Sequence, residues 1–452
     1  MTAARDGSLS HALANAALGW RWADLPHAVQ RQALRSLVNF FACALAGFRD
    51  PAVATAARVF DRIGPAGACT RIGSGKTASP LHAASLNAMA ANVFDFDDTH
   101  LPTIAHPTAP VAPVALALSQ TRRTSGIELL EAVTAGIELQ CRIALAISPG
   151  HYSRGWHITS TCGVFGAAMA ASRLLGLDAQ RTVWAFGSAA AQGAGLVETL
   201  GTMAKSLSVG NAASNGLLAA WLAEQGFAGP PAPLEGERGF VPVFGPSVNW
   251  PALADGLGER WEILANTFKP YPCGVVLNPV IEACLALRPS VAHRLDSIVR
   301  IELRAHPLLR ERTDRPGVSS GKLSQVSAQH AVAVSLRRGR AGLNEFSDEA
   351  VGDDALRSFE RRLVLVDDDS MKVETAEVTL VMREGDRFVH RIDAAHGSLA
   401  APLTDDELSA KCRELARHGG SGIDADALLD ALWSLARAPD ASVVLELAAG
   451  RV

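Results

Sequence analysis

The spacing of apolar residues constrains the fold of this chain more than any other feature, because it changes from a helical to a strand period and back. Up to about residue 290 apolar positions recur at helical spacing, and they do so again after Thr404. The first long helix is predicted to begin after Asp24-Leu25-Pro26 and to end at Gly47. Its apolar side is formed by residues four positions apart: Val29, Ala33, Leu37 and Phe41.

Other helices are marked by their ends and by small residues. Ser125 with Glu128, and Thr404 with Glu407, have the spacing of a capping box. Between residues 163 and 176 small side chains line one helical side, so neighbouring backbones are expected to approach closely there. These small residues are Gly163, Gly166, Ala167 and Ala170.

The strand period begins close to residue 299. Val299, Ile301 and Leu303 alternate with charged residues, which is typical of a half-exposed strand. Residues 363–366 form a second apolar run. Residues 378–382 and 388–392 flank Glu384-Gly385-Asp386 and predict a hairpin with a short turn.

These patterns predict a mainly α protein, with a large all-helical domain and a smaller inserted α+β domain. The hydrophobic content of 48% with only 6% aromatic residues favours closely packed helices. We expect the first part of the helical domain at 1–266, the α+β domain at 267–395, and the returning C-terminal helices at 396–452. The Pro- and Gly-rich segment 228–251 is predicted to cross the surface between the two domains.

Charge and cysteine usage exclude several classes of protein. The net charge of −4 is spread without a basic run, so we expect no binding to nucleic acid or to an anionic membrane. Seven scattered cysteines without a CxxC pair indicate reduced thiols rather than disulfides or a thiolate zinc site. The best apolar stretch, from Cys162 to Leu177, contains Arg173 and is short for a membrane span. We therefore expect a cytoplasmic protein.

The densest polar cluster runs from Asp95 to His100 and is followed by His106. It can be explained as a helix end, in which carboxylates cap backbone N–H groups. Three carboxylates beside histidines are also suited to Mg²⁺, and an enzyme of prenyl diphosphates is the extreme form of that idea. No second acidic cluster follows downstream and aromatic residues are few. We therefore expect no metal.

Further segments place a basic residue in an apolar setting, and each also has a plain structural explanation. His157 directly precedes the Gly163 helix, where an anion can bind at a helix N-terminus. Lys205 lies among small residues. The prolines of Lys269-Pro270-Tyr271-Pro272 hold an extended segment. His330 begins an apolar run that reads as a helix.

Taken together and in order, these segments resemble the MmgE/PrpD family, which includes 2-methylcitrate dehydratase, cis-aconitate decarboxylase and iminodisuccinate epimerase. The resemblance spans nearly the whole chain. It rests on six segments: DFDDTH (95–100), HPT (106–108), GWHITSTCGVFGAA (155–168), GTMAKSLSVGNAA (201–213), KPYPC (269–273) and SAQHAVAV (327–334). It implies the two domains described above, a cleft between them and a homodimer.

The resemblance also implies roles for individual residues. Asp95, His106, His157 and Lys205 are expected to be catalytic, and Thr99, Lys269, Tyr271 and His330 to bind substrate. Histidines with a pKa near neutrality are suitable acids and bases for moving a proton next to a carboxylate. Lysines would neutralise a di- or tricarboxylate and stabilise the developing negative charge. No cofactor is required.

Three functions follow from these residues. The first is a lyase that dehydrates a hydroxy-polycarboxylate or decarboxylates an unsaturated one. The second is an epimerase of an α-substituted dicarboxylate, and the third is a non-catalytic carboxylate-binding protein. Two features depart from relatives: some carry a histidine in the neighbourhood of Asn278 that this chain lacks, and His330 stands where some carry a tyrosine. We expect both to influence the choice of substrate.

Overall fold

The computed structural model describes residues 8–64 and 67–450 and divides into two compact units. The helical unit contains the described parts of Met1–Val93, Asp97–Thr267 and Thr404–Val452. The α+β unit contains Phe94–Phe96 and Phe268–Leu403. Helices dominate and the sheets are small, so the predicted mainly α fold is confirmed.

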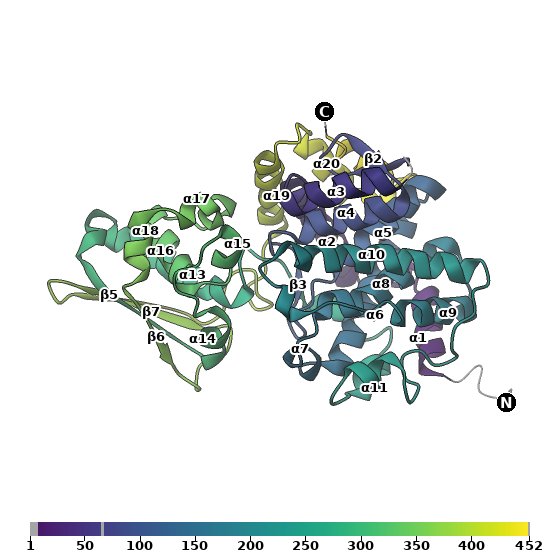
Figure 1. Cartoon of the computed structure of the whole chain (residues 1–452), viewed down its shortest axis with the longest axis horizontal. Helices are drawn as coiled ribbons and strands as arrows, with labels where there is room; N and C mark the ends of the chain where they lie inside the picture. The colour runs from purple at the N-terminus through teal and green to yellow at the C-terminus, as the bar shows by residue number, and fades with distance from the viewer. Residues whose placement is uncertain (1–7, 65–66, 451–452) are drawn as a thin grey trace. The chain divides into compact units, whose positions relative to one another are not determined.

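The helical unit is built from long helices that stack on one another (Figure 1). Within it, α8 packs against α6 and α10, and α4 packs against α2, α5 and α10. Its α-helices are α1 (Leu9–Gly19), α2 (His27–Gly47), α3 (Pro51–Ile63), α4 (Pro80–Asn92), α5 (Thr108–Arg122), α6 (Gly126–Ile147), α7 (Gly150–Ser153), α8 (Ile158–Leu175), α9 (Ala179–Ala190), α10 (Met203–Glu224), α11 (Phe240–Phe244), α12 (Trp250–Ala254), α19 (Asp405–Gly419), α20 (Ala425–Trp433) and α21 (Val443–Leu447).

The predicted helix ends are confirmed. Helix α2 follows Pro26 and ends at Gly47, and its four predicted apolar residues are all buried. Ser125 and Thr404 each accept a hydrogen bond from the backbone N–H three residues later. The glutamate at that third position bonds back to the cap residue, which completes each capping box.

Small residues allow α6 and α8 to approach closely, as predicted. A Cβ atom added at Gly166 would lie 2.7 Å from the carbonyl oxygen of Gly136, and one added at Gly136 would lie 2.6 Å from that of Gly166. Helix α10 approaches α8 in the same way, because a Cβ at Gly216 would lie 2.7 Å from the carbonyl oxygen of Val164. Glycine at these positions is therefore a packing requirement.

A buried ion pair fixes the end of α6 to a neighbouring loop. Arg142 Nε donates to Glu138 Oε1 at 2.7 Å, and neither side chain is more than 1% exposed. The remaining guanidinium nitrogens donate to backbone carbonyls of Leu253, Asp255, Gly256 and Arg260. Burial raises the pKa of Glu138 to about 7, against the opposing effect of Arg142.

In the described part of the helical unit, two short antiparallel strand pairs accompany the helices. Strand β1 (Cys69–Arg71) pairs with β2 (Lys76–Ala78). Strand β3 (Thr99–His100) pairs with β4 (Asn266–Thr267) and so joins the acidic cluster to the segment that precedes Lys269.

The α+β unit contains a four-stranded sheet in the order β6-β5-β7-β8. Strand β5 (Ile298–Ala305) is parallel to β6 (Leu363–Asp367) and antiparallel to β7 (Ala376–Met382), which pairs in turn with β8 (Arg387–Ile392). Helix α13 packs on β7 and β8, and α16 packs on α13. The α-helices are α13 (Asn278–Val291), α14 (Pro307–Thr313), α15 (Gly321–Ser324), α16 (Ala328–Arg338), α17 (Asp348–Val351) and α18 (Asp354–Glu360).

The predicted strands are confirmed with one correction. Ile301 and Leu303 are buried as expected, but Val299 is 48% exposed and Ile298 takes the core position. A bulge between Ile298 and Arg300 shifts the register by one residue, which moves Val299 to the open face. The predicted hairpin is β7–β8, with Gly385 at φ 98° in its turn.

The prediction for segment 228–251 was wrong. It belongs to the helical unit, and the chain enters the α+β unit only at Phe268. The segment contains α11 and the first residues of α12, and Leu234, Phe240 and Val241 are buried. Its prolines and glycines therefore shape a packed loop.

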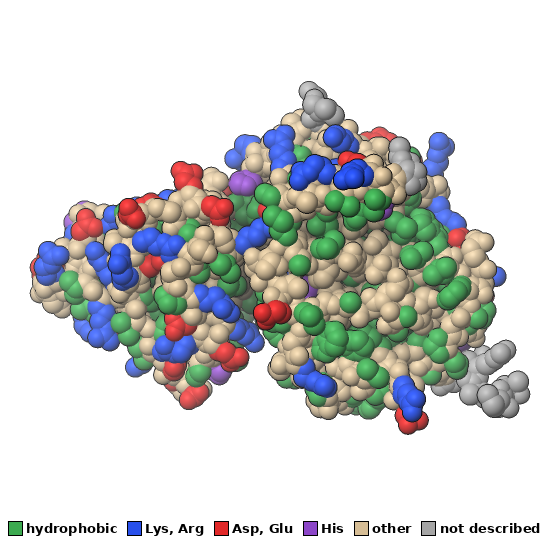
Figure 2. Space-filling view, viewed as in Figure 1, with side chains coloured by type: hydrophobic (Ala, Val, Ile, Leu, Met, Phe, Trp, Pro, Cys, Tyr) green, Lys and Arg blue, Asp and Glu red, His purple; other side chains and the backbone are tan. Residues whose placement is uncertain are grey.

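Within the described residues, two helical segments have the length and hydropathy of a membrane span, Ile158–Leu175 and Val275–Ser297, and a bent pair of helices, α2 with α3, would make a third. The expectation that no stretch is long enough was therefore wrong. Of the 18-residue apolar window in each segment, 83% and 56% respectively is buried inside the protein, so packing accounts for much of its apolar character. On the face shown in Figure 2, charged side chains are dense over the α+β unit and sparser over the helical unit.

The seven cysteines all lie within the described residues, and each is free and buried.

Candidate functional site

The residues predicted to form the site fall into two groups, one in each unit. The helical unit carries Thr99, His106, His157 and Lys205, and the α+β unit carries Asp95, Lys269, Tyr271 and His330. Their roles in catalysis and binding stay predictions. The structure establishes what each side chain contacts within its own unit.

His106 lies between β3 and α5 and is 7% exposed. Its Nδ1 lies 2.8 Å from the carbonyl oxygen of Asp98 and 3.2 Å from Asp97 Oδ1. The carbonyl oxygen can only accept a hydrogen bond, and so can an ionised carboxylate. Nδ1 therefore carries the proton. Nε2 is then the nitrogen that gains or loses a proton. An acidic residue behind one imidazole nitrogen is a common way to orient a histidine base.

Asp98 is a buried carboxylate surrounded by hydrogen-bond donors, and the sequence did not single it out. Its Oδ2 accepts hydrogen bonds from Thr108 Oγ1 and Asn266 Nδ2, whereas Oδ1 is buried without a hydrogen-bond partner in residues 8–64 and 67–450. Burial and the neighbouring charge of Asp97 raise the pKa of Asp98 to about 6, although the two hydrogen bonds oppose this rise. The carboxyl of Asp98 therefore holds its proton to a higher pH than an ordinary aspartate does.

Thr99 lies in β3 and is 2% exposed. Its carbonyl oxygen accepts a hydrogen bond from Thr267 Oγ1 at 2.9 Å. Its own Oγ1 is buried and has no hydrogen-bond partner within the described part of the chain. A buried hydroxyl normally has a partner, so this oxygen is suited to bond a ligand or a water molecule.

His157 is the N-cap residue of α8 and is 3% exposed. Its backbone N–H donates to the carbonyl oxygen of Gly195 at 3.0 Å. Its Nδ1 lies 3.1 Å from Ser160 Oγ and 3.4 Å from Ser208 Oγ. The ring is therefore held between the first turn of α8 and the second turn of α10.

Lys205 lies in the first turn of α10, which is capped by Thr202, and is 9% exposed. Ser208 is one helical turn further on, and its hydroxyl donates to the carbonyl oxygen of Lys205 at 2.7 Å. The same hydroxyl faces His157, so the Lys205 turn of α10 lies beside the start of α8.

A second bond joins His106 to the start of α8. The backbone N–H of His106 donates to Thr159 Oγ1 at 3.0 Å. Thr159 follows His157 by two residues, so the structure brings both predicted acid/base histidines to the N-terminal turn of one helix. Free backbone N–H groups at such a position favour negative charge.

In the α+β unit, Lys269 and Asp95 form a close pair. Lys269 Nζ lies 2.9 Å from Asp95 Oδ2 and 2.7 Å from the Asp95 carbonyl oxygen, and the lysine is 3% exposed. Asp95 has φ 52°, a left-handed conformation that Asp tolerates better than most residues. Gln325 Nε2 donates to the carbonyl oxygens of Phe94 and Pro272 and so ties the two segments together.

Tyr271 is partly buried beside the core of the α+β unit. Burial, together with the nearby charge of Glu282, raises the pKa of its phenol. The phenol therefore stays protonated at neutral pH. Asn278 is buried at the start of α13, where its Oδ1 lies 3.8 Å from Cys273 Sγ.

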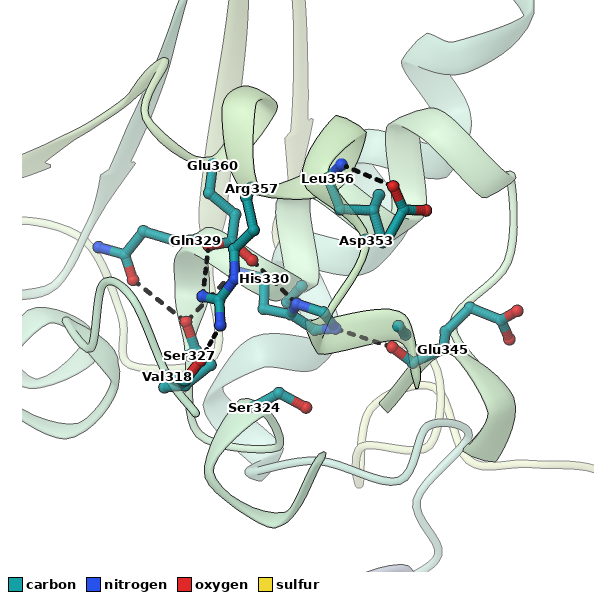
Figure 3. Close-up of polar contacts among 12 residues, drawn as sticks. Val318, Ser324, Ser327, Gln329, His330, Glu345, Asp353, Leu356, Arg357 and Glu360 are labelled. Carbon is teal, nitrogen blue, oxygen red and sulfur yellow. Dashed lines mark hydrogen bonds and ion pairs between the residues drawn. The ribbon is translucent and has the colours of Figure 1, made fainter. Parts of the chain in front are cut away.

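His330 lies inside the α+β unit with 0% exposure (Figure 3). Its Nε2 lies 2.8 Å from the carbonyl oxygen of Glu345, which can only accept, and its Nδ1 lies 2.9 Å from Glu360 Oε1. Glu360 is also within 3.3 Å of Arg357, which donates to the carbonyl oxygen of Val318. Both ring nitrogens are thus engaged inside the unit, and a bond from His330 to a substrate would require one of them to be released.

Sequence reasoning missed several residues around the predicted ones: Asp98, Thr159, Ser160, Gly195 and Ser208. Asp98 was part of the acidic cluster, but its hydrogen bond from Asn266 joins residues that are distant in the sequence. Ser208 follows Lys205 at helical spacing, which is a weak signal. Its contact with His157 depends on how α8 and α10 pack.

Two family models match this chain. The MmgE/PrpD N-terminal domain matches residues 11–252, and the MmgE/PrpD C-terminal domain matches residues 271–435. The chain belongs to the MmgE/PrpD family. Curated relatives include a cis-aconitate decarboxylase-like protein of Aspergillus oryzae, 28% identical across 99% of this chain and 98% of that protein.

Two further relatives carry the name cis-aconitate decarboxylase. The mouse protein is 28% identical over 82% of this chain and 79% of its own length. That of Aspergillus terreus is 27% identical over 94% of this chain and 92% of its own length. The comparisons support an enzyme of MmgE/PrpD type.

Proposed function

We propose that this chain is a cofactor-independent lyase that decarboxylates cis-aconitate or a closely similar unsaturated tricarboxylate. The relatives described above support decarboxylation as the reaction. Breaking the bond to the departing carboxylate releases CO₂ and leaves an electron pair on a carbon chain that still carries carboxylates. That pair is conjugated with the double bond and must finally take up a proton at carbon. The enzyme therefore needs positive charge for binding and one well-placed acid.

The observation that carries the proposal is the geometry of His106. Its Nδ1 faces Asp97 Oδ1 at 3.2 Å and the Asp98 carbonyl oxygen at 2.8 Å, so proton exchange falls to Nε2. His106 is bonded to Thr159 at the start of α8, and His157 at that same helix start supplies a second imidazole. Lys205, on the adjacent turn of α10, supplies a buried ammonium. In a site that excludes water, such charges stabilise a carbanion-like transition state strongly.

The remaining predicted contacts follow the same logic. Thr99 Oγ1 would donate to a substrate oxygen, and Asp95, Lys269 and Tyr271 are proposed from the family resemblance. For His330, whose two ring nitrogens are engaged inside its own unit, we propose a structural role in place of the substrate contact expected from sequence. Asp95 would orient a basic group or act as a base, and Lys269 would grip a carboxylate.

The test is to incubate the full chain with a panel of four- to seven-carbon di- and tricarboxylates in D₂O and to follow the products by NMR. Release of CO₂ with one deuterium incorporated at carbon is the expected result for cis-aconitate. A new alkene formed with loss of water would instead identify a dehydratase. Inversion with deuterium at the α-carbon would identify an epimerase. Binding without any change in the panel would favour a carboxylate-binding protein.

Metal dependence is tested in the same assay. The proposal requires that EDTA followed by gel filtration leaves the rate unchanged. Loss of activity that Mg²⁺ restores would revive the metal-binding explanation of the acidic cluster.

We also propose that the chain forms a homodimer in the cytoplasm, as the family resemblance implies. Sedimentation equilibrium should give twice the 47.4 kDa mass of one chain. A mass of one chain at micromolar concentration would contradict it.

A further inference from the structure

The arrangement of hydroxyls around His157 goes beyond assigning it to the site, because it specifies which ring nitrogen carries the proton. Two hydroxyls lie near Nδ1, Ser160 Oγ at 3.1 Å and Ser208 Oγ at 3.4 Å. A serine hydroxyl has one proton and two lone pairs, so it donates once and can still accept. The state of Nδ1 therefore depends on where those two protons point.

Both hydroxyl protons already have acceptors that cannot donate in return. Ser208 Oγ lies 2.7 Å from the carbonyl oxygen of Lys205, and Ser160 Oγ lies 3.0 Å from the carbonyl oxygen of His157. Serine in a helix commonly donates to a carbonyl in the preceding turn. The bond from Ser208 to Lys205 is 0.7 Å shorter than its contact with Nδ1 (3.4 less 2.7), so its proton points to the carbonyl.

The backbone beside Ser160 leaves little room for another arrangement. Gly195 has φ 138°, and a Cβ atom added there would lie 2.0 Å from Ser160 Oγ and 3.4 Å from the Cβ of His157. The carbonyl oxygen of Gly195 accepts from the His157 N–H at 3.0 Å, and the Val197 N–H donates to the carbonyl oxygen of Gly155 at 2.8 Å. Segment 195–197 thus holds His157 and Ser160 in place.

We infer that Ser208 is a positioning residue that, with Ser160, accepts a hydrogen bond from Nδ1–H of His157 and so makes Nε2 the nitrogen that exchanges a proton with the substrate. His157 then matches His106, whose Nδ1 also faces acceptors. In both imidazoles Nε2 is the nitrogen that exchanges a proton. An acidic residue orients His106, and hydroxyls orient His157. The catalytic part of this inference rests on the proposed function, whereas the protonation state does not.

The protonation state is measured on the full chain without substrate. With ¹⁵N-labelled histidine, long-range ¹H–¹⁵N correlations at a pH where the ring is neutral distinguish a protonated from an unprotonated ring nitrogen. The His157 signals are those that disappear in His157→Gln. We expect a protonated Nδ1 and an unprotonated Nε2. The opposite pattern would overturn the inference.

The role of Ser208 is measured with three variants. Ser208→Ala should reduce the share of the Nδ1–H form and lower kcat for cis-aconitate roughly tenfold with little change in KM, as expected for one lost hydrogen bond to a reacting group. Ser208→Thr keeps the hydroxyl and should restore both the share of the Nδ1–H form and kcat. Ser214→Ala is the matched control, since Ser214 also lies on α10 and donates to the carbonyl oxygen three residues earlier.

The outcomes separate the inference from the proposed function. Unchanged nitrogen signals in Ser208→Ala would overturn the positioning role even if the rate falls. A second outcome is that Nδ1 of His157 is protonated and Ser208→Ala reduces the share of this form, while the protein converts no carboxylate. This would support the inference about His157 and contradict the proposed function.

Discussion

The ammonium group of Lys269 donates to two oxygens of a single residue, the carboxylate and the backbone carbonyl of Asp95, at 2.9 and 2.7 Å. Asp95 has φ 52°, a conformation that costs a non-glycine residue on the order of 1 kcal/mol. The lysine therefore fixes both the backbone and the side chain of the residue that begins the acidic cluster.

Replacing this lysine should cost activity through Asp95. Lys269→Met removes charge-assisted hydrogen bonds worth roughly 1.5–3 kcal/mol, so we expect kcat/KM for cis-aconitate to fall about ten- to hundredfold. Asp95→Asn should lower it as well. The double variant should be little worse than the more damaging single one, because paired residues couple. Losses that simply multiply would show that the two act separately.

Gly195 is sensitive to substitution because there is no room for a side chain beside Ser160. Gly195→Ala would place its Cβ 2.0 Å from Ser160 Oγ, so we expect His157 to shift and turnover to fall at least about tenfold, since small misplacements of catalytic groups are costly. Gly226→Ala is the control. Gly226 also has a positive φ, of 85°, but has nothing within 4 Å of an added Cβ. Equal losses in both variants would attribute the effect to backbone strain alone.

Asp98 makes stability depend on pH. Its pKa is about 6 in the folded chain against 3.8 for an ordinary aspartate, so between these values the folded state binds more protons than the unfolded state. Stability from this group is present at low pH and is lost as the pH rises through about 6. The difference corresponds to roughly 3 kcal/mol.

Asp98→Asn cannot ionise and still accepts from Thr108 and Asn266. Denaturant unfolding of both proteins from pH 4 to 7.5 should show the wild type losing stability relative to the variant as the pH rises. A constant difference across this range would show that Asp98 does not titrate there.

The buried pair in α6 supports a prediction about stability alone. Arg142→Met leaves Glu138 without its partner and frees four backbone carbonyls, so we expect about 3–5 kcal/mol less unfolding free energy. Adding Glu138→Leu should recover part of this loss, because the unpaired carboxylate is then removed. If the double variant is less stable than Arg142→Met, the carbonyl contacts rather than the charge dominate.

His330 separates a structural from a binding role. Its contacts with Glu345 and Glu360 predict that His330→Gln lowers the unfolding free energy by about 2–4 kcal/mol. The KM for cis-aconitate should stay within about twofold of the wild type in the folded fraction. A tenfold rise in KM at unchanged melting temperature would instead support the substrate contact expected from sequence.

Local signals in the sequence were sufficient for the elements and the fold class. Helix α2 and the two capping boxes depend on residues within one or two turns, and the β7–β8 hairpin depends on a short turn. Val299 was misplaced because a bulge is set by pairing with β7 rather than by alternation. Segment 228–251 was misread because proline and glycine indicate a turn without indicating what packs on it.

The candidate site was predictable as residue types but not as contacts. Six segments in order identified His106, His157 and Lys205 through the family resemblance. The carboxylate oxygen and carbonyl that orient His106, the hydroxyl of Ser208 and the hydrogen-bond donors around Asp98 depend on packing between distant segments. Nothing in the sequence near His330 indicates Glu360, thirty positions away.

The seven buried thiols make the chain a convenient host for site-selective labelling. Burial raises the pKa of Cys69 to about 11 and those of Cys162 and Cys412 to about 12, so almost none of these three is thiolate at neutral pH. A single cysteine introduced at an exposed position, such as Leu207 on α10 at 39% exposure, would react with a maleimide far faster than these thiols. A fluorophore placed there would report on the turn of α10 that carries Lys205 and Ser208, without prior removal of the natural cysteines.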